Sequence, residues 1–75
     1  MSQDDLRIIL LDYMISNPIG FDGLAIDIGI STVTLKGLVW GKRTLRPDTW
    51  RKADNFVKKM AEAGDIDIDN ALEKK

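Results

Sequence analysis

The sequence contains no cysteine and no histidine among its 75 residues. Without cysteine, the chain can form neither disulfide bonds nor thiolate metal sites. Without histidine, it lacks the usual general base, the usual nitrogen ligand of zinc and a group that titrates near neutral pH. It also lacks an apolar run of the ~18 residues that a membrane-spanning helix needs. We therefore expect a protein of bacterial or viral origin that lies in the cytoplasm of the bacterial host cell. We expect that it is not an enzyme and has no catalytic residue, metal, other cofactor, small-molecule substrate or membrane segment.

Seventy-five residues, of which 44% are apolar, suffice for one small folded domain. The net charge is −1, but the charges are unevenly distributed. Residues 1–35 have a net charge of −4 and residues 60–75 have −3. Residues 36–59 hold eight basic against two acidic side chains, a net charge of +6. One basic segment in an acidic chain is typical of a selective nucleic-acid binder rather than a general one.

The middle of the sequence predicts two short helices joined by a tight turn, over about residues 22–28 and 32–40. Ala25 is small enough to lie where two helices cross. Four residues later, Gly29 suits a turn in which the backbone is left-handed. Ser31 can then accept a hydrogen bond from a free N–H group at the start of the second helix.

Leu35 and Leu38 are three residues apart in the second of these helices, so they face the same side, toward the first helix. Together with the small residue and the glycine turn, they predict a helix-turn-helix over residues 21–41. That motif commonly places its second helix in the major groove of DNA.

Two further helices are expected around this motif, within a domain of residues 1–64. Ser2 and Asp5 resemble a capping box, and the first helix should end near Ser16, before Asn17-Pro18. Its apolar side comprises Leu6, Ile9, Leu10, Tyr13 and Met14, widened by Ile8, Leu11 and Ile15. The last helix should begin at a cap formed by Asp48 and end at Gly64, with an apolar side of Trp50, Ala53, Phe56, Val57 and Met60. We expect Tyr13 and Trp50 to lie in the core.

Residues 65–75 form an acidic C-terminal segment. Aspartate and isoleucine alternate from Asp65 to Asp69, which is typical of a strand. We favour an extended segment whose isoleucines pack against the core. One alternative is an edge strand that mediates dimerisation, and another is a short helix through Ala71 and Leu72, capped by Asp69.

Several short motifs follow one another in a fixed order between residues 21 and 47. They are Leu24-Ala25, Ile28-Gly29-Ile30-Ser31, Leu35, Gly41-Lys42-Arg43 and Pro47. In this order they resemble the phage repressor/Cro-type (lambda repressor-like) helix-turn-helix domains, and the resemblance continues to about residue 63. It implies an all-α fold of four to five short helices. It also implies a sequence-specific transcription regulator from a bacteriophage or prophage, a Cro-like repressor that binds operator DNA as a homodimer and joins the nucleoid when bound.

We expect the helix at 32–40 to enter the major groove. Lys36 can donate to guanine O6 and N7, and Val33 can pack on thymine methyl groups. The expected base contacts are Ser31, Thr32, Val33, Lys36, Gly37 and Trp40. The expected phosphate contacts, which fix position rather than read sequence, are Lys42, Arg43 and Arg46.

Two apolar departures from the family pattern support a second hypothesis. Phe21 stands where the family often has a phosphate-binding glutamine, and Val39 stands where it commonly has glutamate. With Val33 and Trp40, they suggest a helix-turn-helix scaffold that binds a protein, such as a phage antirepressor that binds a repressor. Trp40 itself has three interpretations: stacking on the DNA backbone, anchoring a protein interface, or folding over the following loop as peripheral core. A third hypothesis is an antitoxin whose residues 65–75 bind a toxin.

Overall fold

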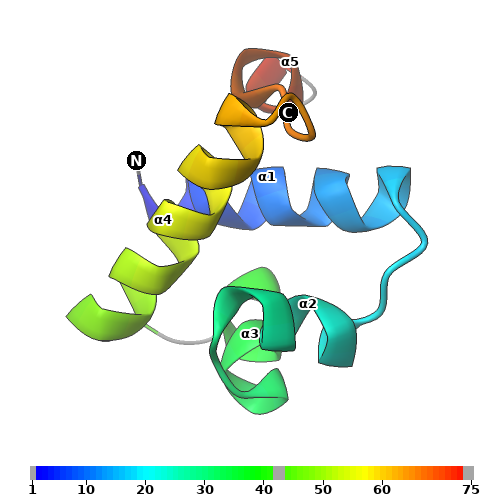
Figure 1. Ribbon diagram of the computed structural model, residues 1–75. Coiled ribbons are helices and arrows are strands. Elements are labelled where there is room, and N and C mark those ends of the chain that lie inside the picture. The colour runs from blue at the N-terminus through cyan, green and yellow to red at the C-terminus, as the bar shows by residue number, and fades with distance from the viewer. Residues whose placement is uncertain (1, 42–43, 74–75) are drawn as a thin grey trace.

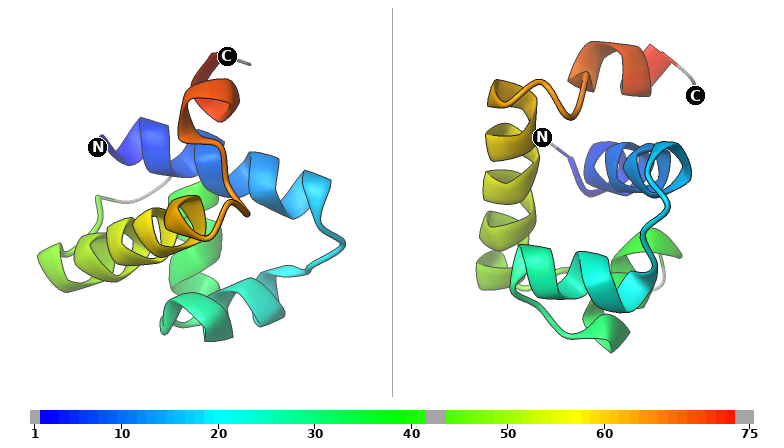
Figure 2. Two further views of the ribbon diagram at one scale, coloured as in Figure 1. Left: turned by 45° about the horizontal axis from the view of Figure 1, so that its top comes forward. Right: turned by 45° about the vertical axis from the view of Figure 1, so that its right-hand side comes forward.

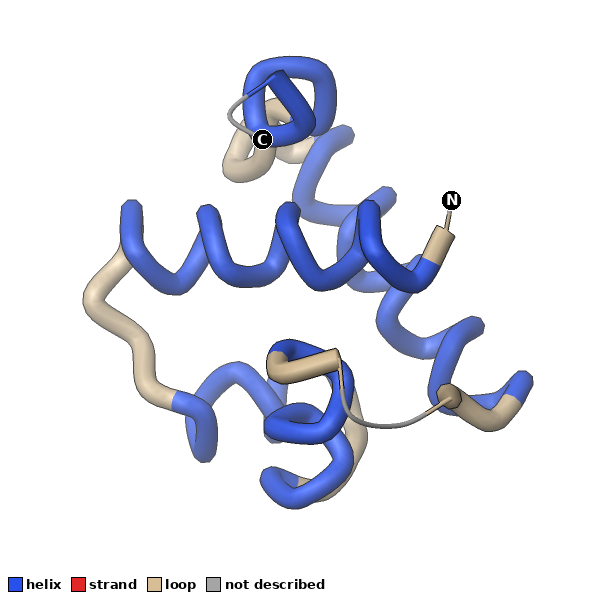
Figure 3. The backbone as a smooth tube through the Cα atoms, turned by 180° about the vertical axis from the view of Figure 1, so that it is seen from behind, coloured by secondary structure: helices blue, strands red, loops and turns tan. Residues whose placement is uncertain are grey.

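Five helices make up most of the chain in the computed structural model, which describes residues 2–41 and 44–73. They are α1 (Gln3–Ser16), α2 (Phe21–Ile28), α3 (Thr32–Val39), α4 (Pro47–Glu62) and α5 (Ile68–Glu73) (Figure 1). The described residues contain no strand (Figure 3). The expected all-α class is confirmed. No helix in this part of the chain is long and apolar enough to cross a membrane.

Helix α1 is the central helix of the domain. It contacts α3, α4 and α5, and the views from two sides show α5 on one side of it and the α2–α3 pair on the other (Figures 1 and 2). Leu6, Ile9 and Leu10 are completely buried in this position. Ile15 does not widen the buried stripe as expected, since 83% of its surface is exposed at the last turn of the helix.

The start and end of α1 agree with the sequence. Ser2 Oγ accepts a hydrogen bond of 3.1 Å from the Asp5 N–H, and the Ser2 N–H donates to Asp5 Oδ2 at 3.5 Å, which is a capping box. The helix ends at Ser16, and its C-cap, Asn17, lies directly before Pro18.

The turn between α2 and α3 has the predicted geometry. Gly29 lies in the left-handed region with φ of +90°, and its N–H donates to the Ala25 carbonyl at 2.8 Å. Ala25 is 2% exposed, while Leu35 and Leu38 are completely buried. The two short helices are therefore fixed against each other by one small residue, one glycine and two leucines.

Helix α4 begins earlier than expected. Arg46 is its N-cap and Pro47 its first residue, so Asp48 lies in the first turn rather than at the cap. Proline suits this position because its fixed φ is helical and the N–H it lacks would have no partner within the helix. Trp50 and Tyr13 are half-buried at the edge of the core rather than inside it.

The expectation of an extended C-terminal segment is wrong for residues 68–73, which form α5. The cap is Asp67, not Asp69: Asp67 Oδ1 accepts a hydrogen bond of 3.1 Å from the Asn70 N–H. The alternation of aspartate and isoleucine arises because Ile66 is buried just before the helix and Ile68 packs against the core from its first turn. The isoleucines therefore pack against the core as expected, but without a strand.

Candidate nucleic-acid interface

The N-terminus of α3 is capped by Ser31, as the sequence predicts. Its Oγ accepts a hydrogen bond of 3.1 Å from the Thr34 N–H and donates one of 2.7 Å to Thr34 Oγ1. The Ser31 side chain is exposed, so it lies at the surface while it stabilises the start of the helix.

One face of α3 points away from the core. Val33 and Trp40, which are two helical turns apart, are 62% and 57% exposed, and Lys36 lies half-buried between them. Leu35 and Leu38 occupy the opposite, buried face. Burial of one side thus leaves three of the expected base-contacting side chains on a single outer stripe.

Phe21, at the start of α2, supports this outer stripe. Its ring meets the Trp40 ring edge-on, with 5.9 Å between centroids and 70° between planes. The Lys36 ammonium lies 5.6 Å from the centroid of the Phe21 ring, within the range of a cation–π contact. Trp40 is therefore not peripheral core, and Phe21 has a structural role that the sequence pattern did not reveal. We call Phe21, Lys36 and Trp40 the aromatic cluster.

Thr32 is tied to the first turn of α2. Its Oγ1 donates a hydrogen bond of 2.8 Å to Asp22 Oδ1. Because the Thr32 hydroxyl donates its proton to Asp22, it cannot donate the same proton to a base or a phosphate. The Thr32 methyl group remains available for apolar contact. The bond also sets a carboxylate beside the start of α3, which the sequence analysis did not anticipate.

Two expected surface residues are buried instead. Gly37 is enclosed within the fold, so it has no surface to offer a base. Val39 is 3% exposed, which removes it from the protein-binding surface suggested by the second hypothesis. Both residues lie on the side of α3 that packs against the domain.

Two cations from the N-terminal part of α4 lie near the start of α3. Arg46 is exposed, and it lines a surface pocket of about 350 Å³ with Thr34, Thr44, Leu45 and Thr49. Guanidinium and hydroxyl groups are common phosphate ligands, and the pocket borders α3 directly through Thr34. Lys42 and Arg43, the other expected phosphate contacts, lie outside the described residues.

Lys52 is a cation that the sequence analysis did not single out. Its Nζ donates a hydrogen bond of 3.2 Å to the Gly29 carbonyl, which places a positive charge beside the turn before Ser31. The sequence shows several basic residues on α4, but only the packing of α4 against α2 reveals which of them reaches this turn.

No protein-family model, curated protein or solved structure matches this chain significantly.

Proposed function

We propose that this protein is a small sequence-specific DNA-binding transcription regulator with a lambda repressor-like helix-turn-helix, and that α3 enters the major groove. The observation that carries the proposal is the exposed stripe of α3 with two cations near its N-terminal half, Arg46 and Lys52. An exposed helix with positive side chains beside its start suits a groove bordered by phosphates.

The exposed side chains suggest how bases would be read. The methyl groups of Thr32 and Val33 suit thymine methyl groups, and Lys36 suits the acceptors of guanine. Ser31 lies at the helix start, and Trp40 lies at the other end, where it can stack against the sugar–phosphate backbone. Gly37 is buried, so it is not among the proposed base contacts.

Phosphate contacts would then hold the helix in position. Arg46 and Lys52 would make these contacts. Lys42 and Arg43 would also contact phosphates, a role that is proposed from their positions in the sequence. We further propose that two copies bind as a homodimer and read two half-sites on one side of the duplex, separated by about 34 Å.

A salt series tests this proposal. The measurement is the dissociation constant for a random duplex and for duplexes from the protein's own gene locus, at several salt concentrations. We expect binding that weakens steeply with salt, and a shallower slope for Arg46→Ala and for Lys52→Ala, because each loses one phosphate contact. Glu62→Gln, at the far end of α4, is the control that should leave the slope unchanged. The proposal fails if no duplex binds more tightly than ~10⁻⁴ M at low salt.

A second candidate is a protein-interaction module, such as an antirepressor that binds a repressor. The observation that favours it is the aromatic cluster, in which Lys36 faces Phe21 and Trp40 stays 57% exposed. Exposed tryptophan is enriched among the residues that dominate protein-binding interfaces. Loss of repressor binding in Trp40→Ala, with no DNA binding by the wild type, would select this candidate.

The antitoxin hypothesis requires residues 65–75 to act as a tail. Ile66 and Ala71 are 7% and 1% exposed, and α5 packs on α1, so this part of the segment belongs to the folded domain. The packing therefore favours the first two candidates.

A further inference from the structure

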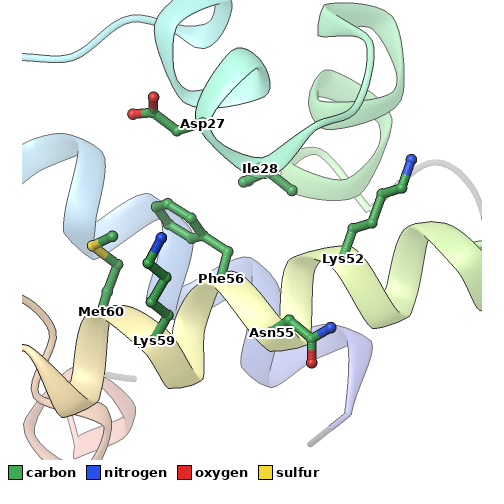
Figure 4. A pocket seen from close by; sticks show the side chains of 7 residues that line it. All are labelled: Asp27, Ile28, Lys52, Asn55, Phe56, Lys59 and Met60. Carbon is green, nitrogen blue, oxygen red and sulfur yellow. The ribbon is translucent and has the colours of Figure 1, made fainter.

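A groove runs between the C-terminal end of α2 and one face of α4 (Figure 4). It encloses about 450 Å³, which is within the range of ligand-binding clefts. Its lining includes none of the residues of α3. The groove therefore lies outside the exposed stripe of α3, although it shares Lys52 with the proposed phosphate contacts.

The floor of the groove is apolar. Ile28 and Phe56 are each 7% exposed, and Met60 is half-buried beside them. The Phe56 ring is held from behind by Tyr13, edge-on at 5.8 Å between centroids and 82° between planes. A rigid aromatic ring next to a flexible methionine can accommodate apolar side chains of different shapes.

The rim of the groove is charged. Lys52 and Lys59 are seven residues apart on α4, about 10.5 Å along the helix axis, and Figure 4 shows both reaching from α4 toward the α2 side. Lys52 is bonded to the Gly29 carbonyl. Lys59 is exposed, and within residues 2–41 and 44–73 it has neither an ion-pair partner nor a side-chain hydrogen bond.

We propose that this groove binds a short acidic amphipathic helix of a partner protein. An apolar face would cover Ile28, Phe56 and Met60, and carboxylates on its flank would meet Lys59 and Lys52. This combination of an apolar floor and a charged rim is the complement of such a helix.

Two other occupants fit the groove less well. Nucleic acid offers phosphates for the lysines, but it has no apolar face to cover the floor formed by Ile28, Phe56 and Met60. A second copy of the chain offers exposed aspartates at 65, 67 and 69, but Ile66 is buried and Ile68 is packed against the core. The acidic segment of a second copy thus cannot present apolar and acidic side chains together.

The test is a titration followed by backbone amide chemical shifts. The probe is a synthetic helical peptide of about 15 residues, made of glutamate, alanine and leucine, with the leucines at positions i, i+3, i+4 and i+7. We expect the amides of Ile28, Asn55 and Phe56 to shift, and the binding to weaken about tenfold in Lys59→Glu. Arg51→Glu is the matched control, since it changes the net charge equally on an exposed side of α4 outside the groove.

Several results would overturn this proposal. They are unshifted groove amides at about 1 mM peptide, equal weakening by Lys59→Glu and Arg51→Glu, and equal binding of a peptide with lysine in place of glutamate. If the chemical shifts of the groove amides change with protein concentration in the absence of peptide, the groove binds a second copy of the chain. If these chemical shifts change on addition of a duplex but not of the peptide, the groove binds DNA. The peptide titration contains no DNA, so its outcome is independent of the proposed function.

Discussion

Thr32 Oγ1 donates a hydrogen bond of 2.8 Å to Asp22 Oδ1, so the first turn of α3 is joined to the first turn of α2. The bond orients α3 at the end that would approach DNA. It also brings a negative charge to that end, where phosphates would be repelled. In the proposed complex, the pair would therefore fix the orientation of α3 at some cost in affinity for DNA.

Asp22→Asn should strengthen binding to any duplex at low salt by roughly threefold to tenfold, because it removes that charge but keeps an oxygen acceptor for Thr32. The measurement is the dissociation constant for a random duplex. Asp69→Asn, an equal change of net charge on α5, is the control that should have a smaller effect. Equal gains for the two variants would mean that only net charge matters and that Asp22 does not lie at the interface.

Gly29→Ala should destabilise the domain by about 1–2 kcal/mol, because alanine is strained at a φ of +90°. For a chain of this size, that corresponds to a fall in melting temperature of roughly 4–8 °C per kcal/mol. Gly20→Ala is the comparison, since the φ of Gly20 is −88° and open space surrounds the position of a Cβ atom. We expect thermal unfolding to show a clearly smaller loss for Gly20→Ala, and comparable losses would contradict the role of the left-handed turn.

Leu35→Ala should cost about 2–5 kcal/mol of unfolding free energy, because Leu35 is completely buried. Val33→Ala, two residues earlier on the outer face, should change stability by less than about 0.5 kcal/mol. Urea unfolding of both variants measures the difference. A large loss for Val33→Ala would show that the outer face of α3 is covered in solution, for example by a second copy.

Trp40 should report contact at the exposed stripe. In Trp50→Phe, Trp40 is the only tryptophan, and its exposure of 57% predicts strong quenching of its fluorescence by acrylamide. We expect bound duplex to reduce that quenching, because the ring would be shielded by the backbone on which it stacks. Trp40→Phe, which leaves the half-buried Trp50, should show little change. Unchanged quenching of Trp40 in a saturated complex would exclude it from the DNA contact.

The sequence predicts the local features of the fold well. Ser2, Gly29 and Ser31 act through bonds to residues at most four positions away, so their types and spacing nearly determine the geometry. The same holds for the burial of Leu35 and Leu38, which follows from helical periodicity.

Features that depend on packing between helices were predicted less well. Gly37 and Val39 are buried because neighbouring helices cover that side of α3, and periodicity alone did not identify this covered side. The alternation at 65–69 suggested a strand, whereas the Asp67 cap and the burial of Ala71 produce a helix. Likewise, the contact of Lys52 with Gly29 spans 23 positions and depends on how α4 crosses α2.

The position of α1 between α3 and α5 has a consequence for the order of folding. Because α1 is synthesised before α5, the side of α1 that α5 covers stays exposed until residues 68–73 have been synthesised. Contacts between helices that are far apart in the sequence also raise the contact order, which slows folding compared with a bundle of neighbouring helices. Native packing of α1 is therefore completed only after translation has passed α5, and an incomplete chain exposes apolar surface that can aggregate.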